Sequence, residues 1–134
     1  MRWTSALGAG ICIAMCVMLA ACTGGKNTGS YSIATGGNSK QGKQLIQSYG
    51  CGACHIIPGI RTAHGLVGPP LLDFGDRTII AGELPNTPPN LVHWIQDPQS
   101  VEPKTAMPDL GLSREQATDI AAYLYTLRGG GGGQ

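Results

Sequence analysis

Cys51-Gly52-Ala53-Cys54-His55 is the stretch that decides how this 134-residue chain folds. Two thiols at this spacing are close enough to add to the two vinyl groups of one haem, and the histidine that follows is then held beside the iron. A thioredoxin-like redox pair should follow a strand in a βαβ unit, and residues 40–65 show no such pattern. A zinc site would need a second cluster of ligands at short spacing, which the chain does not offer. The stretch therefore predicts one covalently attached haem, bound through Cys51 and Cys54, with His55 as an axial ligand.

The first 21 residues are typical of an export signal. Arg2 gives a short positive start, and residues 5–21 are apolar or small and carry no charge. The segment ends in Leu19-Ala20-Ala21-Cys22, which resembles the lipobox of bacterial lipoproteins and implies cleavage before Cys22, with a lipid on that cysteine. An ordinary cleavage site and an uncut membrane anchor are the alternatives. We therefore expect an exported protein that its lipid anchors to the outer face of a bacterial membrane, on the periplasmic side.

Composition divides the rest of the chain into three parts. Residues 22–38 are rich in Gly, Ser, Thr and Asn and predict a flexible tether. Residues 39–128 hold all nine prolines and every helix signal, and predict one domain. Residues 129–134 are five glycines and a glutamine, which predict a disordered tail. Of nine Lys and Arg, one lies in the leader, so eight balance eight Asp and Glu in the remainder. A nucleic-acid partner would require a basic excess, and none is expected.

Capping residues mark a helix at the start of the domain. It is expected to run from Asn38 or Ser39 to about Tyr49, and Asn38 with Gln41 has the spacing of a capping box. The longest β-branched run in the proline-rich middle, residues 78–80, is too short to predict a strand.

Two further helices are expected in the second half of the domain. Thr87-Pro88-Pro89 supplies an N-cap and a first-turn proline, and Asp97-Pro98 ends the helix that follows. Ser113-Arg-Glu-Gln116 is a capping box that starts the last helix. That helix is expected to end at Arg128, whose charge suits the helix dipole, with Gly129 as its C-cap.

The second axial ligand decides what a bound haem can do. Met107 is the only methionine after the leader, and it lies next to Pro108 in a loop that could reach the haem face opposite His55. His64 and His93 are alternative ligands, and a buried gap-filling residue is the other interpretation of Met107. Iron with two protein ligands cannot easily bind a substrate, so the His55/Met107 pair favours one-electron transfer.

The segment from about Lys40 to Arg128 resembles a class I monohaem cytochrome c. Beyond the attachment stretch, the matching motifs are Gly68-Pro69-Pro70-Leu71, Met107-Pro108 and Ala122-Tyr123-Leu124. The resemblance implies an all-α cytochrome c fold, with three main helices and Pro/Gly-rich loops wrapped around one covalent haem.

The same resemblance implies two contacts. The carbonyl of Pro69 would accept the ring N–H of His55 and fix its tautomer. The first and last helices would cross where a glycine meets an aromatic residue, for which Gly42 and Tyr123 are the candidates.

Residues 84–98 resemble cytochrome c domains attached to bacterial respiratory oxidases. This implies an electron carrier, rather than an enzyme, whose partners are respiratory donor and acceptor proteins and whose electrons pass toward a terminal oxidase. A fixed haem c subunit of a larger complex is the first alternative, and a haem sensor or enzyme with an open iron is the second. Trp94 and Arg77 could each serve a haem propionate, or be a core side chain and a surface cation.

Overall fold

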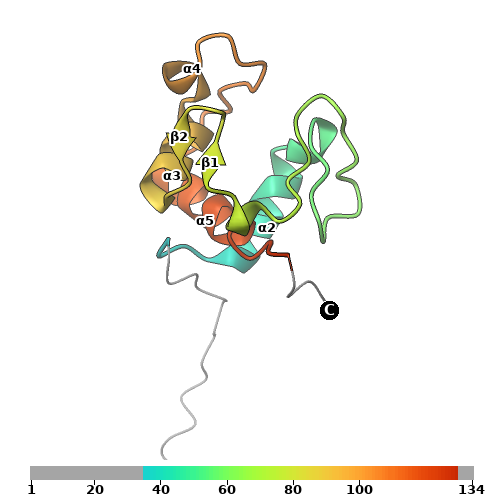
Figure 1. Ribbon diagram of the computed structural model, residues 1–134. Coiled ribbons are helices and arrows are strands. Elements are labelled where there is room, and N and C mark those ends of the chain that lie inside the picture. The colour runs from blue at the N-terminus through green and yellow to red at the C-terminus, as the bar shows by residue number, and fades with distance from the viewer. Residues whose placement is uncertain (1–34, 130–134) are drawn as a thin grey trace, which may run out of the picture.

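The computed structural model describes residues 35–129. The predicted signal peptide, Cys22, and most of the predicted tether and tail lie outside these residues. The elements are α2 (Ser39–Ser48), η2 (Cys51–Ala53), η3 (Phe74–Asp76), β1 (Ile79–Ile80), β2 (Leu84–Pro85), α3 (Pro88–Gln96), α4 (Pro98–Val101) and α5 (Arg114–Leu124) (Figure 1). Within the described range, no helix has the length and apolar character needed to cross a membrane.

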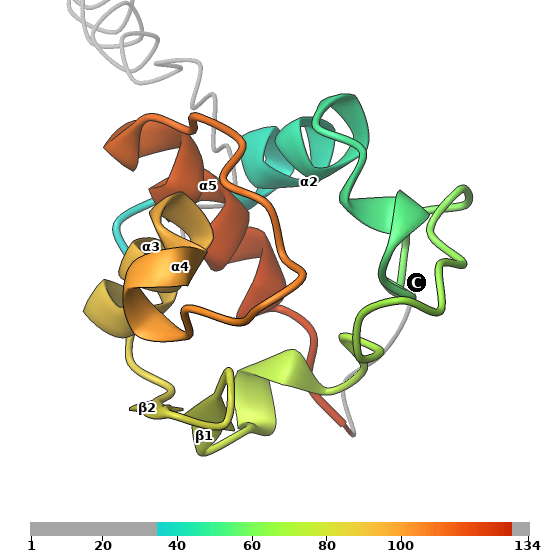
Figure 2. The ribbon, with the colours of Figure 1, turned by 90° about the horizontal axis from the view of Figure 1, so that it is seen from above.

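Helix α5 is the centre of the fold, with α2 packed on one side and α3 on the other (Figure 2). The loop after η2 rises beside α2, and the loop between α4 and α5 rises on the opposite side (Figure 1). Apolar side chains from all three helices form the core beneath these loops. The buried aliphatic side chains that the three helices contribute include Ile46, Leu91, Ile95, Ile120 and Leu124.

The crossing of α2 and α5 depends on Gly42. A Cβ atom at this position would overlap the backbone of Asp119 and lie 3.0 Å from the nitrogen of Ile120, so only glycine lets the helices approach this closely. The glycine of the predicted crossing is thus in place, and its nearest neighbours across the interface are backbone atoms of α5. Tyr123 lies one turn further along α5, where its hydroxyl donates to the carbonyl of Pro58 at 2.7 Å.

The capping box predicted at the start of α2 is half wrong. The Asn38 side chain does accept hydrogen bonds from the N–H groups of Lys40 and Gln41, both at 3.1 Å. The reciprocal bond from Asn38 N–H goes to the carboxylate of Asp119 at 2.7 Å, and Gln41 does not receive it. A carboxylate brought in by α5 is a stronger acceptor than a neutral amide, which explains the exchange.

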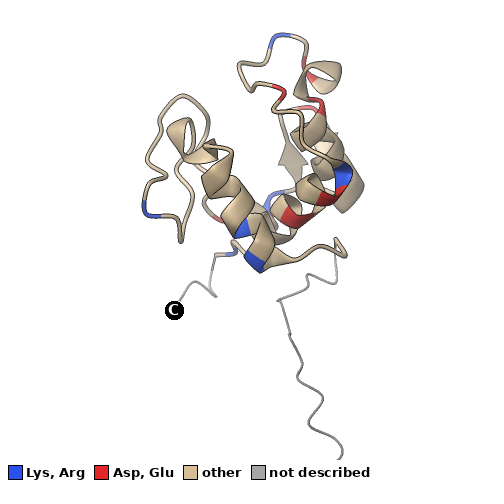
Figure 3. Cartoon of the chain, turned by 180° about the vertical axis from the view of Figure 1, so that it is seen from behind, with Lys and Arg blue, Asp and Glu red and all other residues tan. Residues whose placement is uncertain are grey.

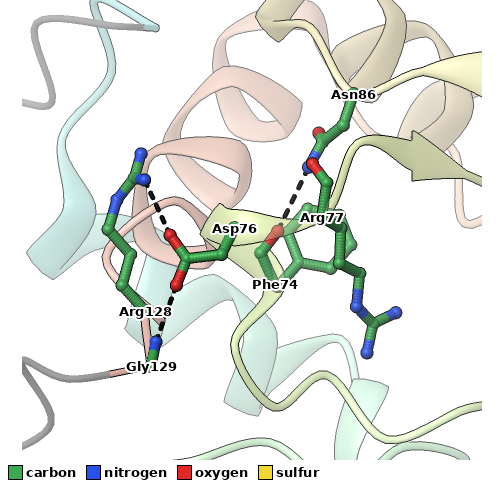
Figure 4. Close-up of polar contacts among 6 residues, drawn as sticks. All are labelled: Phe74, Asp76, Arg77, Asn86, Arg128 and Gly129. Carbon is green, nitrogen blue, oxygen red and sulfur yellow. Dashed lines mark hydrogen bonds and ion pairs between the residues drawn. The ribbon is translucent and has the colours of Figure 1, made fainter.

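Helix α5 begins where predicted and ends earlier. Both bonds of the capping box formed by Ser113 and Gln116 are present, at 3.2 and 2.9 Å. The helix stops at Leu124, short of the expected end at Arg128. Arg128 and the N–H of Gly129 instead bind the two carboxylate oxygens of Asp76, at 2.9 and 2.7 Å (Figure 4). This pair of bonds draws the chain away from the helix axis, so the predicted dipole and C-cap roles were wrong.

A short hairpin corrects the expectation of an all-α fold. Strands β1 and β2 pair antiparallel, with Ile79 opposite Pro85 and Ile80 opposite Leu84. Three residues, 81–83, connect the strands, and the first two, Ala81 and Gly82, have positive φ, at 55° and 75°, which turns the chain back on itself within this short loop. Burial of Ile80 in the core holds a strand that is too short to be recognised by sequence pattern.

A fourth helix, α4, was also not among the three predicted. Thr87 and Pro88 begin α3 as expected, although the Thr87 side chain makes no cap hydrogen bond. Asp97 ends α3 and at once starts α4, because its side chain accepts a hydrogen bond from the N–H of Ser100 at 3.2 Å. One residue therefore serves as C-cap and N-cap for consecutive helices.

Candidate haem-binding site

A cavity of about 510 Å³ lies between the loop after η2 and the loop before α5. Its volume is within the range of about 300–1,000 Å³ that is usual for ligand and cofactor sites. All five residues that the sequence predicted for the site line this cavity. These are Cys51, Cys54, His55, Pro69 and Met107. Within the described part of the chain, the lining includes neither His64 nor His93, and both histidines are exposed.

The attachment stretch takes its shape from glycines. Gly50 adopts φ 71°, a left-handed conformation that turns the chain out of α2 and into η2. Gly52 is buried, and a Cβ atom there would lie 2.7 Å from the Cα of Ala63. The N–H of His55 donates to the carbonyl of Cys51 at 3.1 Å, which closes the turn. The two thiols and the imidazole are thereby held on one wall of the cavity.

Cys51 and Cys54 are free thiols. Burial raises the pKa of the Cys51 thiol above its ordinary value, and the charge of Cys54 adds to the rise, while a backbone hydrogen bond at Cys51 opposes it. A raised pKa keeps the hydrogen on sulfur at neutral pH.

The ring of His55 is oriented by the backbone that faces it. Its Nδ1 lies 2.8 Å from the carbonyl oxygen of Pro69. A carbonyl oxygen can only accept, so Nδ1 carries the hydrogen and Nε2 keeps the lone pair that a metal requires. Gly68 passes so close that a Cβ atom would lie 2.6 Å from Nδ1, and its N–H donates to the carbonyl of Cys54 at 2.8 Å. The contact that the resemblance implied is therefore present.

Met107 enters the cavity from the loop that precedes α5, and the chain holds that loop at several points. The Met107 N–H donates to the hydroxyl of Thr105 at 3.2 Å, and its carbonyl accepts from the Gln99 side chain at 2.7 Å. The side chain of Gln96 donates to the carbonyl of Leu112 at 3.1 Å. The two glutamines belong to α3 and α4, and nothing in their local sequence distinguishes them from surface residues.

Arg77 and Trp94, whose roles the sequence left open, both line the cavity. The guanidinium of Arg77 donates to the carbonyl oxygens of Pro70 and Leu72, the latter at 3.3 Å, and lies 5.4 Å from the centre of the Phe74 ring. Arg77 therefore binds the backbone that follows Pro69, which is a structural role that neither earlier alternative included.

Asn86 is a further residue that sequence reasoning missed. Its side-chain nitrogen donates to the carbonyl oxygens of Phe74 and Arg77, at 3.1 and 2.9 Å (Figure 4). Its side-chain oxygen accepts from the hydroxyl of Tyr125 at 2.8 Å. Asn86 thus connects the cavity wall around η3 to the end of α5. An isolated asparagine between prolines carries no signal of such a role.

The chemistry of this cavity suits a haem. Its walls are largely apolar, two thiols are available for covalent attachment, and an imidazole with its Nε2 lone pair free lies beside them. Met107 contributes a thioether from a separate loop of the same cavity. Imidazole and thioether are both established axial ligands of haem iron.

Comparison with known proteins agrees with this chemistry. The sequence model of the family described as "Cytochrome c" matches residues 39–128. The chain is also similar to proteins named cytochrome c oxidase subunit 2: 38% identical over 91 residues for Alkalihalophilus pseudofirmus, 35% over 94 for a Bacillus species and 33% over 94 for Bacillus subtilis. Each match covers 67% of this chain but 26% of the relative. The chain therefore spans about a quarter of the length of these relatives.

Proposed function

The chain belongs to the cytochrome c family, and we propose that it is a membrane-tethered monohaem cytochrome carrying single electrons in a respiratory chain toward a terminal oxidase. Membership of the family makes it an electron-transfer protein with covalently bound haem. One observation carries the proposal: thiols, imidazole and thioether, from segments far apart in sequence, line the same cavity.

We assign each residue of the site a role. Cys51 and Cys54 would hold the haem through thioether bonds, and His55 and Met107 would be the ligands of its iron. The bound haem supplies an iron that gains and loses one electron. Pro69 keeps the hydrogen of His55 on Nδ1, so that Nε2 always faces the metal. The hydrogen bonds around Met107 hold its loop in one conformation, which suits a site that changes little between oxidation states.

The anchor and the destination of the electrons are further parts of the proposal. A lipid on Cys22 and the tether at residues 22–38 would keep the domain at the membrane surface. The oxidase acceptor is supported by the three relatives, which are named as oxidase subunits. The same names favour a second candidate, in which the chain is a fixed haem c subunit of a larger respiratory complex.

The axial assignment is tested by Met107→Ala in protein made by a host that attaches haem. Mass spectrometry of the denatured protein should first show the haem retained on the chain. The parent protein should show the weak red absorption band of sulfur-to-iron bonding when oxidised, and should bind carbon monoxide poorly when reduced. The variant should lose the band, bind carbon monoxide readily and have a lower reduction potential, because the thioether favours reduced iron.

His64→Ala and His93→Ala are matched controls, because they remove the rival ligands, and both should behave like the parent. If the reduced parent protein binds carbon monoxide readily at neutral pH, its iron has an open position. Electron transfer through a six-coordinate site would then be refuted in favour of a sensor or an enzyme.

A further inference from the structure

Met107 is held at both of its peptide groups, and the two bonds differ in where their partners lie. Its N–H donates to the hydroxyl of Thr105, two residues earlier in the same loop, at 3.2 Å. Its carbonyl oxygen accepts from the side-chain nitrogen of Gln99, on α4, at 2.7 Å. If the loop moves, Thr105 moves with it and its bond is kept. The bond from Gln99 is therefore the one that resists a displacement of Met107.

Helix α4 gives Gln99 a fixed base. The carboxylate of Asp97 accepts from the N–H of Ser100 at 3.2 Å, which caps the helix, and Pro98 beside it is fully buried. The hydroxyl of Ser100 donates its single hydrogen to the carbonyl of Asp97 at 2.8 Å, so it accepts from Nε2 of His93, 3.0 Å away. Since His93 belongs to α3, these bonds tie α4 to a helix whose other face is in the core.

The part of the loop around Met107 has no other hydrogen bond to the helices. Apart from the bond of Gln99, all hydrogen bonds of residues 103–111, which the structure describes throughout, join groups no more than three positions apart. Charges do not hold the loop either. Figure 3 shows few charged positions on it, and in the described part of the chain none forms an ion pair: Glu102, Lys104 and Asp109. A segment with so few bonds to its surroundings opens at a small cost in free energy.

We propose that Gln99 is a positioning residue for the axial ligand: its hydrogen bond to the Met107 carbonyl keeps the thioether on the haem iron and sets how often that coordination position opens. The inference rests on the proposed function, in which Met107 is the ligand. Gln99 acts from outside the cavity, since it is not among the residues that line it. No pattern in the sequence connects a glutamine after a proline with a methionine eight residues later.

An outside ligand reports the opening. When neutral imidazole takes the position, the bond from the Met107 sulfur to iron breaks and a bond from an imidazole nitrogen to iron forms. Both ligands are uncharged, so no electron or proton is transferred. The apparent affinity for imidazole therefore contains the cost of displacing Met107, and a weaker hold on the loop makes binding tighter.

The test titrates the oxidised, full-length holoprotein with imidazole. Gln99→Leu removes the donor at similar side-chain size, and because the position is exposed the core keeps its packing. Loss of one neutral hydrogen bond should raise the apparent affinity for imidazole about three- to tenfold. The red absorption band of sulfur-to-iron bonding should disappear at correspondingly lower imidazole concentration. In rapid mixing at saturating imidazole the limiting rate should rise too, because it reports the departure of Met107.

Two further variants separate the hydrogen bond from other effects. Gln99→Lys supplies N–H donors on a side chain of similar length, and should bind imidazole within about twofold of the parent. Tyr123→Phe removes a hydrogen bond of the same length, 2.7 Å, between α5 and Pro58, away from the Met107 loop. It should also leave the affinity within about twofold of the parent, because the cost of opening is local to one loop.

An unchanged affinity in Gln99→Leu would overturn the inference and leave the proposed function intact. An equal rise in Gln99→Lys would overturn it as well, because the shape of the side chain and not its hydrogen bond would then matter. An equal rise in Tyr123→Phe would mean that imidazole reports general stability, and the inference would fail. If the parent lacks the red band and binds imidazole as tightly as Met107→Ala, Met107 is not the ligand, and the axial assignment fails together with the inference.

Discussion

Gly42→Ala should break the closest helix crossing in the domain. The added methyl group would overlap the carbonyl of Asp119 and crowd the nitrogen of Ile120, and neither backbone atom can move without moving α5. To restore ordinary contact distances, the two helices would have to separate by about 1.5 Å in a core that is packed at crystal-like density. The charged hydrogen bond from Asn38 N–H to Asp119, 2.7 Å long, spans the same crossing and would be stretched.

The expected loss follows from these terms. Overpacking of this kind costs about 1–3 kcal/mol, and weakening a hydrogen bond to a carboxylate adds about 1 kcal/mol. Alanine recovers about 0.5–1 kcal/mol, because glycine is the poorer residue inside a helix. We expect the free energy of unfolding of the holoprotein to fall by about 1–3.5 kcal/mol.

Guanidinium unfolding followed by circular dichroism would measure this change. Gln44→Ala is the matched control, since it makes a substitution to alanine at an exposed position of the same helix and should alter stability by less than about 0.5 kcal/mol. A Gly42→Ala protein as stable as the parent would refute the reasoning, because it would mean that α2 and α5 are not held by backbone contact at this residue.

Two other predictions concern the phenol of Tyr123 on α5 and the lipid anchor proposed at Cys22. Burial raises the pKa of the Tyr123 phenol above its usual value of about 10, so the folded protein keeps this proton longer than the unfolded chain does. Its contribution to stability is complete below pH ~10 and is lost as the pH rises through the folded pKa. Tyr123→Phe should lower the free energy of unfolding by about 1 kcal/mol at pH 7, because the hydrogen bond to Pro58 is lost, and should make the fall in stability at alkaline pH smaller. Denaturant unfolding at pH 7 and 11 would measure both effects. An equal fall in stability between these pH values in the parent and the variant would contradict the prediction. Cys22→Ser should release the protein from membranes or leave its leader uncleaved, as judged by fractionation and mass spectrometry, whereas Cys16→Ser should not. A processed Cys22→Ser protein that stays with the membrane would exclude the lipid.

Interactions between residues close in the chain were predictable. The capping box of Ser113 with Gln116 and the start of α3 at Thr87 depend on groups within one helical turn, so pattern alone found both. The attachment stretch is likewise local, and the spacing of its cysteines and histidine predicts covalent haem attachment without any knowledge of the fold. The family resemblance supplied the contact between His55 and Pro69 in advance.

The errors have one physical origin, which is the arrival of a group from elsewhere in the chain. The carboxylate of Asp119 took the donor that a local capping box would have used, and the carboxylate of Asp76 pulled Arg128 and Gly129 off the end of α5. The hairpin formed because burial of Ile80 supports a pairing of two residues that has no sequence period. Such contacts form only after a long loop has closed, so no window of sequence contains them.

The sequence by itself determined the reactive groups, their order and the starts of the helices, because those depend on neighbours along the chain. Tertiary structure alone decided that Met107 shares a cavity with His55, and that α3 and α4 hold its loop in place. It alone held Gly65 and Gly68 against the attachment turn, whose backbone lies more than ten residues earlier in the chain. The first set follows from covalent spacing and local hydrogen bonds, and the second from close packing, which selects one arrangement only when the whole chain is folded.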